Sequence, residues 1–205
     1  MKQSDYYAAS REAAVYPHLR QAVDLVAANA GNIAVDVGCG AGRNTRFLLQ
    51  RGFVVHAYDN NPEALEHTRA LGNQPQLFTA CSSFETFDYP QAALITASSS
   101  LFFCQAQHFD EAWRRIVQAL RTGGIFCGHF MGPMDSWVQL ERRDLSVHDR
   151  AQTEQLFDGF ELLDLYEYNQ PGKTLLGRSK HWHTYSVLAR KTAQGLPAST
   201  GSLRR

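Results

Sequence analysis

The sequence predicts an α/β fold: a single doubly wound domain built around a mostly parallel sheet. Three observations indicate this fold. Short apolar segments alternate with segments of helical period, the first clear apolar segment runs into a glycine-rich turn, and 205 residues suit one domain of this kind. Strands that alternate with helices imply right-handed crossovers, with helices on both faces of the sheet.

The expected elements follow one another along the chain. Helix 16–29 precedes strand 33–37, helix 43–51, strand 53–58, helix 62–71 and strands 76–80 and 92–97. Helix 107–121 has Phe109, Trp113 and Ile116 at helical spacing, and Gly123-Gly124 is expected to end it before strand 125–130. Helix 150–157 and strands 160–168 and 182–189 complete the series. No helix separates the last two strands, so they should form an antiparallel hairpin at one edge.

Residues 1–191 are expected to form the single domain, with 1–30 as an N-terminal lid and helices. Residues 192–205 are rich in small and polar side chains without apolar period, which predicts a flexible tail.

The composition predicts a cytoplasmic protein. Twenty basic and twenty acidic side chains give zero net charge, without the basic excess that nucleic-acid binding favours. No apolar run reaches the length of a membrane span, and the first residues do not resemble a signal peptide. We therefore expect no nucleic acid and no membrane as partner, and a monomer or homodimer. The four cysteines form no C-x-x-C pair and are expected to be buried free thiols.

A glycine-rich turn indicates a nucleoside-containing ligand. Residues 34–45 read Ala-Val-Asp-Val-Gly-Cys-Gly-Ala-Gly-Arg-Asn-Thr, so Asp36 precedes three glycines at every second position. Glycines let the backbone pass close to a ligand, and the helix that follows directs free N–H groups toward an anion. The next expected strand ends at Asp59, where an acid suits a ribose diol.

The spacing of the glycines indicates which nucleoside-containing cofactor the turn would bind. In the NAD fingerprint G-x-G-x-x-G, the third glycine would fall on Arg43 or Thr45, so both registers fail. The pattern present is D-x-G-x-G-x-G, with Asp59 seventeen residues after Gly42. Over residues 30–131 the chain thus resembles class I S-adenosylmethionine (SAM)-dependent methyltransferases. Asp36 to Asn44 is similar to the D-L-G-C-G-x-G-R-N of compact bacterial small-molecule enzymes like the tellurite-resistance methyltransferases.

The resemblance implies a Rossmann-like sheet of seven strands in the order 3-2-1-4-5-7-6, with SAM as cofactor and S-adenosylhomocysteine as product. Ser82 to Phe84 match the loop that borders the adenine, although many relatives have an acid where this chain has Cys81 or Ser82. Ser98 and Ser99 match the loop beside the methionine part. The implied cofactor-binding residues are Tyr7, Asp36, Gly38, Cys39, Gly40, Gly42, Asn44, Asp59, Asn60, Ser82, Ser83, Phe84, Ser98 and Ser99.

The acceptor is expected beyond the carboxyl ends of the parallel strands, where the last strand of the hairpin must begin. Candidate substrate-binding residues are Arg11, His129, Asp135, Trp137 and Lys180. His181 and His183 are candidate catalytic bases, because imidazole titrates near neutral pH. A surface pair or a metal half-site are the alternatives for these two histidines. No third metal ligand is obvious, so no metal is expected.

The resemblance implies methyl transfer by direct displacement to a nitrogen, oxygen, sulfur or heavier chalcogen of a small molecule. An NAD(P)-dependent oxidoreductase and a non-catalytic SAM-binding module remain as alternatives. Strand 92–97 is not followed by Asn-Pro-Pro-Tyr, which argues against the enzymes that methylate amino groups of nucleic acids.

Overall fold

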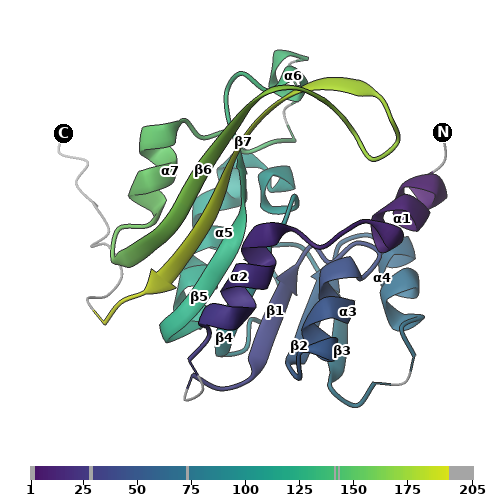
Figure 1. The fold of residues 1–205 in the computed structure, drawn as a ribbon, viewed down its shortest axis with the longest axis vertical. Coiled ribbons are helices and arrows are strands. Elements are labelled where there is room, and N and C mark those ends of the chain that lie inside the picture. Colours follow the sequence, from purple (N-terminus) through teal and green to yellow (C-terminus); the bar gives the residue numbers. More distant parts are fainter. Residues whose placement is uncertain (1–2, 28–29, 73, 141, 143, 194–205) are drawn as a thin grey trace.

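A computed structural model of the chain, which describes residues 3–27, 30–72, 74–140, 142 and 144–193, contains a seven-stranded sheet (Figure 1). The strand order is β3-β2-β1-β4-β5-β7-β6, as predicted. Strands β1 to β5 pair in parallel, and β7 runs antiparallel to both β5 and β6. The strands are β1 Ile33–Val37, β2 Val54–Asp59, β3 Leu77–Cys81, β4 Ala92–Ala97, β5 Leu120–Met131, β6 Phe160–Lys173 and β7 Ser179–Lys191.

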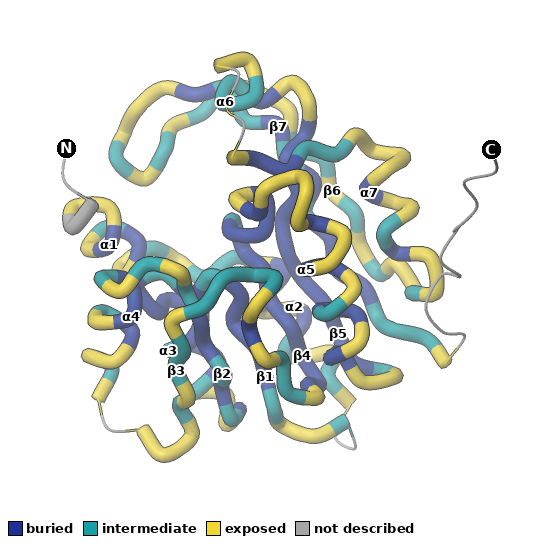
Figure 2. Tube along the Cα trace, turned by 180° about the vertical axis from the view of Figure 1, so that it is seen from behind, coloured by how far each residue is buried: buried dark blue, intermediate teal, exposed yellow. Residues whose placement is uncertain are grey.

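Helices cover both faces of this sheet. They are α1 Gln3–Glu12, α2 Pro17–Leu25, α3 Arg43–Gln50, α4 Pro62–Arg69, α5 Ala106–Ala119, α6 Ser136–Gln139 and α7 Arg150–Leu156, with a 3-10 turn at Leu101–Phe103. Apolar side chains of α2, α3 and α4 pack on one face, and those of α5 and the end of α7 on the other. The central strands between these layers are buried (Figure 2). None of the described helices is long and apolar enough to cross a membrane.

Several expected boundaries are wrong, each for a local reason. Helix 16–29 is shorter, because Pro17 begins it and Val26 is already extended; 28–29 lie outside the described residues. Helix α5 ends at Ala119 rather than at the glycines, because Leu120 pairs with Ala92 in the sheet. Helix α6 is not among the expected elements, whereas α1 lies in the region expected to form an N-terminal lid and helices. All four cysteines are free, but Cys81 is exposed rather than buried.

The C-terminal hairpin is longer than its sequence indicates. Pairing between β5 and β7 stops at Met131 and Thr184, whereas β6 and β7 remain paired as far as Lys173 and Ser179. Residues 169–183 therefore form a two-stranded extension beyond the sheet, here called the hairpin arm. Figure 1 shows that the arm leaves the carboxyl edge of the parallel strands and curves toward α1.

The packing under β5 depends on a cluster of aromatic rings. The indole of Trp113 on α5 lies 5.1 Å from the ring of Phe126, 5.7 Å from Phe130 and 5.2 Å from Phe157, measured between centroids. Edge-to-face pairs at such distances add to the free energy of apolar burial. This cluster fixes β5, whose last residues reach the site described below.

Replacing Phe126, which has 0% exposure, should therefore destabilise the fold strongly. Phe126→Ala is expected to lower the free energy of unfolding by about 3–5 kcal/mol, because it removes the ring and leaves a cavity. The matched control is Phe78→Ala on edge strand β3, where the ring is 52% exposed and the expected loss is within about 0.5 kcal/mol. Urea denaturation measures both. Similar losses in the two variants would contradict this description of the core.

Candidate active site

A cavity of about 1390 Å³ lies at the carboxyl edge of the parallel strands. Its wall consists of loops that follow β1 to β5, the start of α2, part of α1 and the hairpin arm. In parallel sheets this edge, where the strand order reverses between β1 and β4, is the usual place for a ligand. The fold thus directs N-terminal, central and C-terminal residues into one space.

The glycine-rich turn and the end of β2 meet at one side of this cavity. The carboxylate of Asp59 accepts a hydrogen bond from the amide of Gly40 at 3.0 Å and another from the amide of Asn61 at 2.9 Å. Gly38 packs so closely on the next loop that an added Cβ would lie 2.6 Å from the Cβ of Ser100. At Gly40 the corresponding position has nothing within 4 Å, so the turn is open to a ligand there.

Three buried polar atoms around this turn have no partner among the described residues: Asp36 Oδ1, Arg43 Nε and Asn44 Oδ1. Buried polar atoms are nearly always hydrogen-bonded, so a ligand or ordered water is the usual partner of such a group. Two acceptors and one donor suit the ammonium and carboxylate of an amino acid. None of these three residues lies on the cavity wall itself.

Burial changes the acidity of Asp36. Loss of hydration raises its pKa to about 6, although a 2.6 Å hydrogen bond from the hydroxyl of Thr45 acts in the opposite direction. Asp36 is therefore mostly ionised at pH 7 and mostly neutral at pH 5.

A cluster of imidazoles and hydroxyls occupies the middle of the cavity wall. The ring of His18 on α2 lies edge-on to that of His129 at the end of β5, with 4.5 Å between centroids. Both nitrogens of His18 are hydrogen-bonded, to the hydroxyls of Ser98 at 3.0 Å and Ser186 at 3.1 Å. Nδ1 of His129 lies 3.1 Å from the amide of Ser99, which donates to it. This group of residues is called the imidazole cluster below.

Both imidazoles are neutral at pH 7. Burial lowers the pKa of His18 to about 4, and the nearby guanidinium of Arg43 acts in the same direction. The pKa of His129 lies well below its ordinary value, because of burial first, then His18 and Arg43. Ser99, which contacts His129, has a φ of +57°, unusual for a residue other than glycine. Such strained backbone is concentrated at functional sites.

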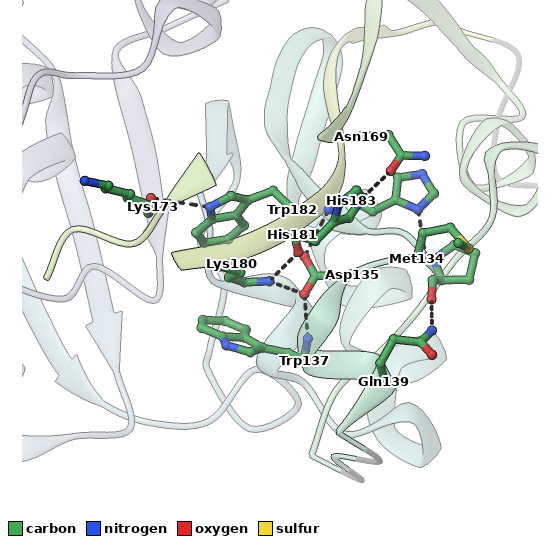
Figure 3. Close-up of polar contacts among 11 residues, drawn as sticks. Met134, Asp135, Trp137, Gln139, Asn169, Lys173, Lys180, His181, Trp182 and His183 are labelled. Carbon is green, nitrogen blue, oxygen red and sulfur yellow. Dashed lines mark hydrogen bonds and ion pairs between the residues drawn. The ribbon is translucent and has the colours of Figure 1, made fainter. Parts of the chain in front are cut away.

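A buried ion pair connects the hairpin arm to the loop after β5 (Figure 3). Asp135 has 0% exposure, and its carboxylate accepts from the ammonium of Lys180 and from the amides of Trp137 at 2.9 Å and His183 at 3.1 Å. The ammonium also lies over the ring of Trp137 at 4.2 Å and over that of Trp182 at 4.1 Å. Burial lowers the pKa of Lys180, while Asp135 opposes the shift.

The structure brings most of the predicted site residues together, but not all. Those on the cavity wall are Tyr7, Gly38, Gly40, Asp59, Asn60, Ser82, Ser83, Phe84, Ser99, His129, Trp137 and Lys180. Those behind the wall or elsewhere are Arg11, Asp36, Cys39, Gly42, Asn44, Ser98, Asp135, His181 and His183. Arg11 is exposed and pairs with its neighbour Glu12.

The two candidate bases are engaged away from the cavity. His183 accepts the amide of Met134 at 3.0 Å and pairs with Glu167 at 3.0 Å, while His181 pairs with Asn169 at 2.7 Å. Their catalytic role stays a prediction. Among the described residues, no three His, Cys, Asp or Glu side chains are grouped to hold a metal ion.

Sequence reasoning missed Tyr16, His18 and the tip of the hairpin arm, which all line the cavity. The guanidinium of Arg43 lies 4.4 Å from the ring centre of Tyr16. These positions belong to no recognisable sequence motif, and they reach the site because α2 packs against β5 and β7.

Comparison with known proteins agrees with this geometry. Residues 34–124 match a family described as "Methyltransferase domain". Among curated proteins, 24-methylenesterol C-methyltransferase 2 of Oryza sativa subsp. japonica is 25% identical over 69% of this chain. The Arabidopsis thaliana protein of the same name is 23% identical over 87% of this chain. The chain spans 39% and 57% of these relatives.

Solved structures show that the chain has the fold of class I methyltransferases, as predicted above. TehB from Haemophilus influenzae superimposes with a TM-score of 0.73 at 16% identity, covering 93% of this chain and 68% of TehB. A second structure is that of the 1,6-didemethyltoxoflavin-N1-methyltransferase of Burkholderia thailandensis, solved with 1,6-didemethyltoxoflavin and S-adenosylhomocysteine. It superimposes with a TM-score of 0.61 at 18% identity, covering 93% of this chain and 87% of that enzyme. The resemblance to compact bacterial methyltransferases is thus confirmed at the level of the fold.

The buried ion pair between Asp135 and Lys180 leads to a testable prediction. Asp135→Ala leaves the buried ammonium of Lys180 without a counter-ion, so the free energy of unfolding should fall by about 3–5 kcal/mol. The matched control is Asp144→Ala, which removes a more exposed pair with Arg142 and should cost at most about 1 kcal/mol. Denaturant titration measures both losses, and hydrogen exchange locates them. Equal losses, or an unchanged hairpin arm in Asp135→Ala, would refute the assigned role.

Proposed function

We propose that this protein is a SAM-dependent methyltransferase that acts on a small-molecule nucleophile. The observation that carries the proposal is the position of Asp59 against the amide of Gly40, on the same cavity wall as the imidazole cluster. A site for an adenosine and a separate site for an acceptor then share one space, as a transfer reaction requires.

Each part of the cofactor has a suitable set of residues in this proposal. Asp59 would hold the ribose hydroxyls, and Ser82 to Phe84 would border the adenine. Gly40 would let the ligand approach the backbone, since nothing lies within 4 Å of its missing Cβ. The unpartnered atoms of Asp36, Arg43 and Asn44 lie behind the cavity wall at this turn, where ordered water would connect them to the amino-acid part.

Bound SAM supplies a methyl group already activated by a positive sulfur, so the protein needs mainly to align the reactants and exclude water. Correct alignment alone is a large contribution, with effective molarities of about 10⁵–10⁸ M in well-oriented systems. The hairpin arm and the residues of α1 that line the cavity would supply the cover. In the single domain 1–191, residues 1–30 accordingly supply both the lid, through α1, and the helix α2 that packs on the sheet.

The acceptor in this proposal is a small molecule that attacks through nitrogen, oxygen, sulfur or a heavier chalcogen. A cavity of about 1390 Å³ can hold both reactants, since single ligands occupy sites of about 300–1,000 Å³. The names of the toxoflavin and sterol methyltransferases also denote small acceptors. Zero net charge supports the absence of a nucleic-acid partner. A cytoplasmic monomer or homodimer without membrane contact completes the proposal.

The experiment compares ligands and then measures transfer. SAM and S-adenosylhomocysteine should each raise the melting temperature of the protein, whereas NADH should not, because ligands that bind only the native state stabilise it. Transfer is then followed with methyl-labelled SAM. Stabilisation by NADH alone would support an oxidoreductase instead, and SAM binding without transfer to any acceptor would support a binding module.

Alanine variants of two glycines, which should cause similar backbone strain, test the cofactor site. Gly40 and Gly52 both have positive φ, +54° and +84°, and nothing lies within 4 Å of either missing Cβ. Gly40→Ala and Gly52→Ala should therefore both lose about 1–2 kcal/mol of stability. Only Gly40→Ala should lose S-adenosylhomocysteine binding in calorimetry, because only its new methyl enters the cavity. Equal affinities would overturn the placement of the cofactor.

The affinity for S-adenosylhomocysteine should depend on pH through Asp36, whose pKa is about 6. As pH rises through this value the carboxyl group ionises and attracts the ligand's ammonium, so binding strengthens; below it, affinity should fall by up to about tenfold per pH unit. Calorimetry between pH 5 and 7 measures this slope. In Asp36→Asn the slope should disappear, and an unchanged slope would assign the titration to another group.

A further inference from the structure

The orientation of His129 limits what this imidazole can do. A backbone amide can only donate a hydrogen bond, so Nδ1, which meets the amide of Ser99 at 3.1 Å, carries no proton. The hydroxyl of Ser99 lies 3.2 Å from the same nitrogen. A neutral ring then has its single N–H at Nε2. His129 therefore offers the cavity a hydrogen-bond donor and no free lone pair.

The surroundings of His129 keep the ring neutral and leave Nε2 available. Tyr16 and His18 at the start of α2 face the ring edge, at 4.7 Å and 4.5 Å between centroids, and Arg43 adds a positive charge nearby. His129 lines the cavity, and no hydrogen bond connects Nε2 to another of the residues that the structure describes. An acceptor atom of the substrate is the natural partner of this N–H.

Few other groups in the cavity could take a proton from the acceptor. His18 is hydrogen-bonded at both nitrogens, and Asp59 accepts two amides and would hold the ribose hydroxyls of the cofactor. The remaining carboxylate on the wall, Asp164, is exposed on β6, and Lys180 is paired with Asp135. An acceptor that arrives already ionised needs no base from the protein.

An N–H donor at the attacking atom also discriminates between nucleophiles. A neutral amine has one lone pair, and a hydrogen bond from His129 would occupy the electrons needed for attack. An oxygen anion has three lone pairs, so one can accept the hydrogen bond while another attacks. A charge-assisted hydrogen bond of this kind also strengthens binding of the anion.

The rest of the cavity is suited to a broad apolar molecule. Among the large apolar side chains that remain exposed, several line the cavity: Phe103 at 40%, Leu140 at 72%, Tyr166 at 58% and Leu175 at 46%. Exposed apolar surface gathered at one opening marks a binding site for apolar ligands. Trp137 and Trp182 extend the same wall toward the hairpin arm.

We propose that the acceptor is an aromatic molecule with an acidic hydroxyl, a phenol or an enol, which binds as its anion with the oxygen accepting from Nε2 of His129. This inference rests on the proposed methyltransferase function. The hydroxyl proton leaves to solvent before attack. A lone pair of the oxygen then forms the bond to the methyl carbon as the carbon–sulfur bond breaks, and that electron pair stays on sulfur. The products are an aryl or enol methyl ether and neutral S-adenosylhomocysteine.

The test compares acceptors of matched shape with methyl-labelled SAM: para-nitrophenol, phenol, para-nitroaniline and para-nitrobenzyl alcohol. Methylation is expected for the phenols, with higher kcat/KM for the nitrophenol at pH 7. The pH at which kcat/KM levels off should follow the pKa of each phenol. A preference for the aniline or the alcohol, or a pH profile common to all acceptors, would overturn the proposal.

Two variants of His129 isolate the donor. His129→Leu removes the N–H and should lower kcat/KM for the phenols about 100-fold, the usual effect of deleting one donor to an anionic oxygen. His129→Gln keeps an N–H donor and should recover most of this loss. Affinity for S-adenosylhomocysteine is measured in parallel and should stay unchanged in both variants. Equal kcat/KM in His129→Leu and His129→Gln would refute the donor role.

The two proposals fail in different ways. If S-adenosylhomocysteine does not bind the unaltered protein, the methyltransferase function itself is wrong. If it binds and only amines or alcohols are methylated, that function stands and the assignment of an acidic acceptor is wrong.

Discussion

The hydrogen bond between the carboxylate of Asp59 and the amide of Gly40 joins the ends of two neighbouring parallel strands across the opening of the sheet. Because β1 and β2 are in register from Ile33 and Val54 onward, the glycine turn and the acid necessarily end at the same edge. The rest of the site is arranged around this contact. Gly38 rests on Ser100 after β4, which places Ser99 and then His129 on the adjoining wall.

The second constraint on the site is burial away from water, which shifts the pKa values of both acidic and basic side chains. Burial raises the pKa of Asp36 and lowers those of His18 and His129, so all three shifts favour the uncharged form. Only Asp36 still changes its charge near pH 6. The site therefore combines the carboxyl groups of Asp36 and Asp59 near the glycine turn with neutral imidazoles on the acceptor side. That separation suits a cationic cofactor at one end and direct displacement at the other.

The sheet order and the glycine turn could be predicted because both leave local signals: alternating apolar segments, and a fixed spacing of Asp36 and three glycines. The hairpin arm could not, since Asn169-Gln170-Pro171-Gly172 has neither apolar alternation nor high strand propensity. Its strands are held by pairing between β6 and β7. Asp135 and Lys180 were each expected to bind substrate, but neither position reveals that they pair with one another. His18 lies in a helix that has no motif, and tertiary packing alone brings it to His129.

A crystal structure of the protein with S-adenosylhomocysteine would show directly where the cofactor binds. The account predicts ribose hydroxyls within hydrogen-bond distance of Asp59, and the sulfur directed toward Ser99 and His129. It also predicts a hydrogen bond, direct or through one ordered water, between the ligand's amino-acid part and at least one of the unpaired atoms of Asp36, Arg43 and Asn44. An adenosine bound away from Asp59, or a sulfur directed away from the imidazole cluster, would contradict the account.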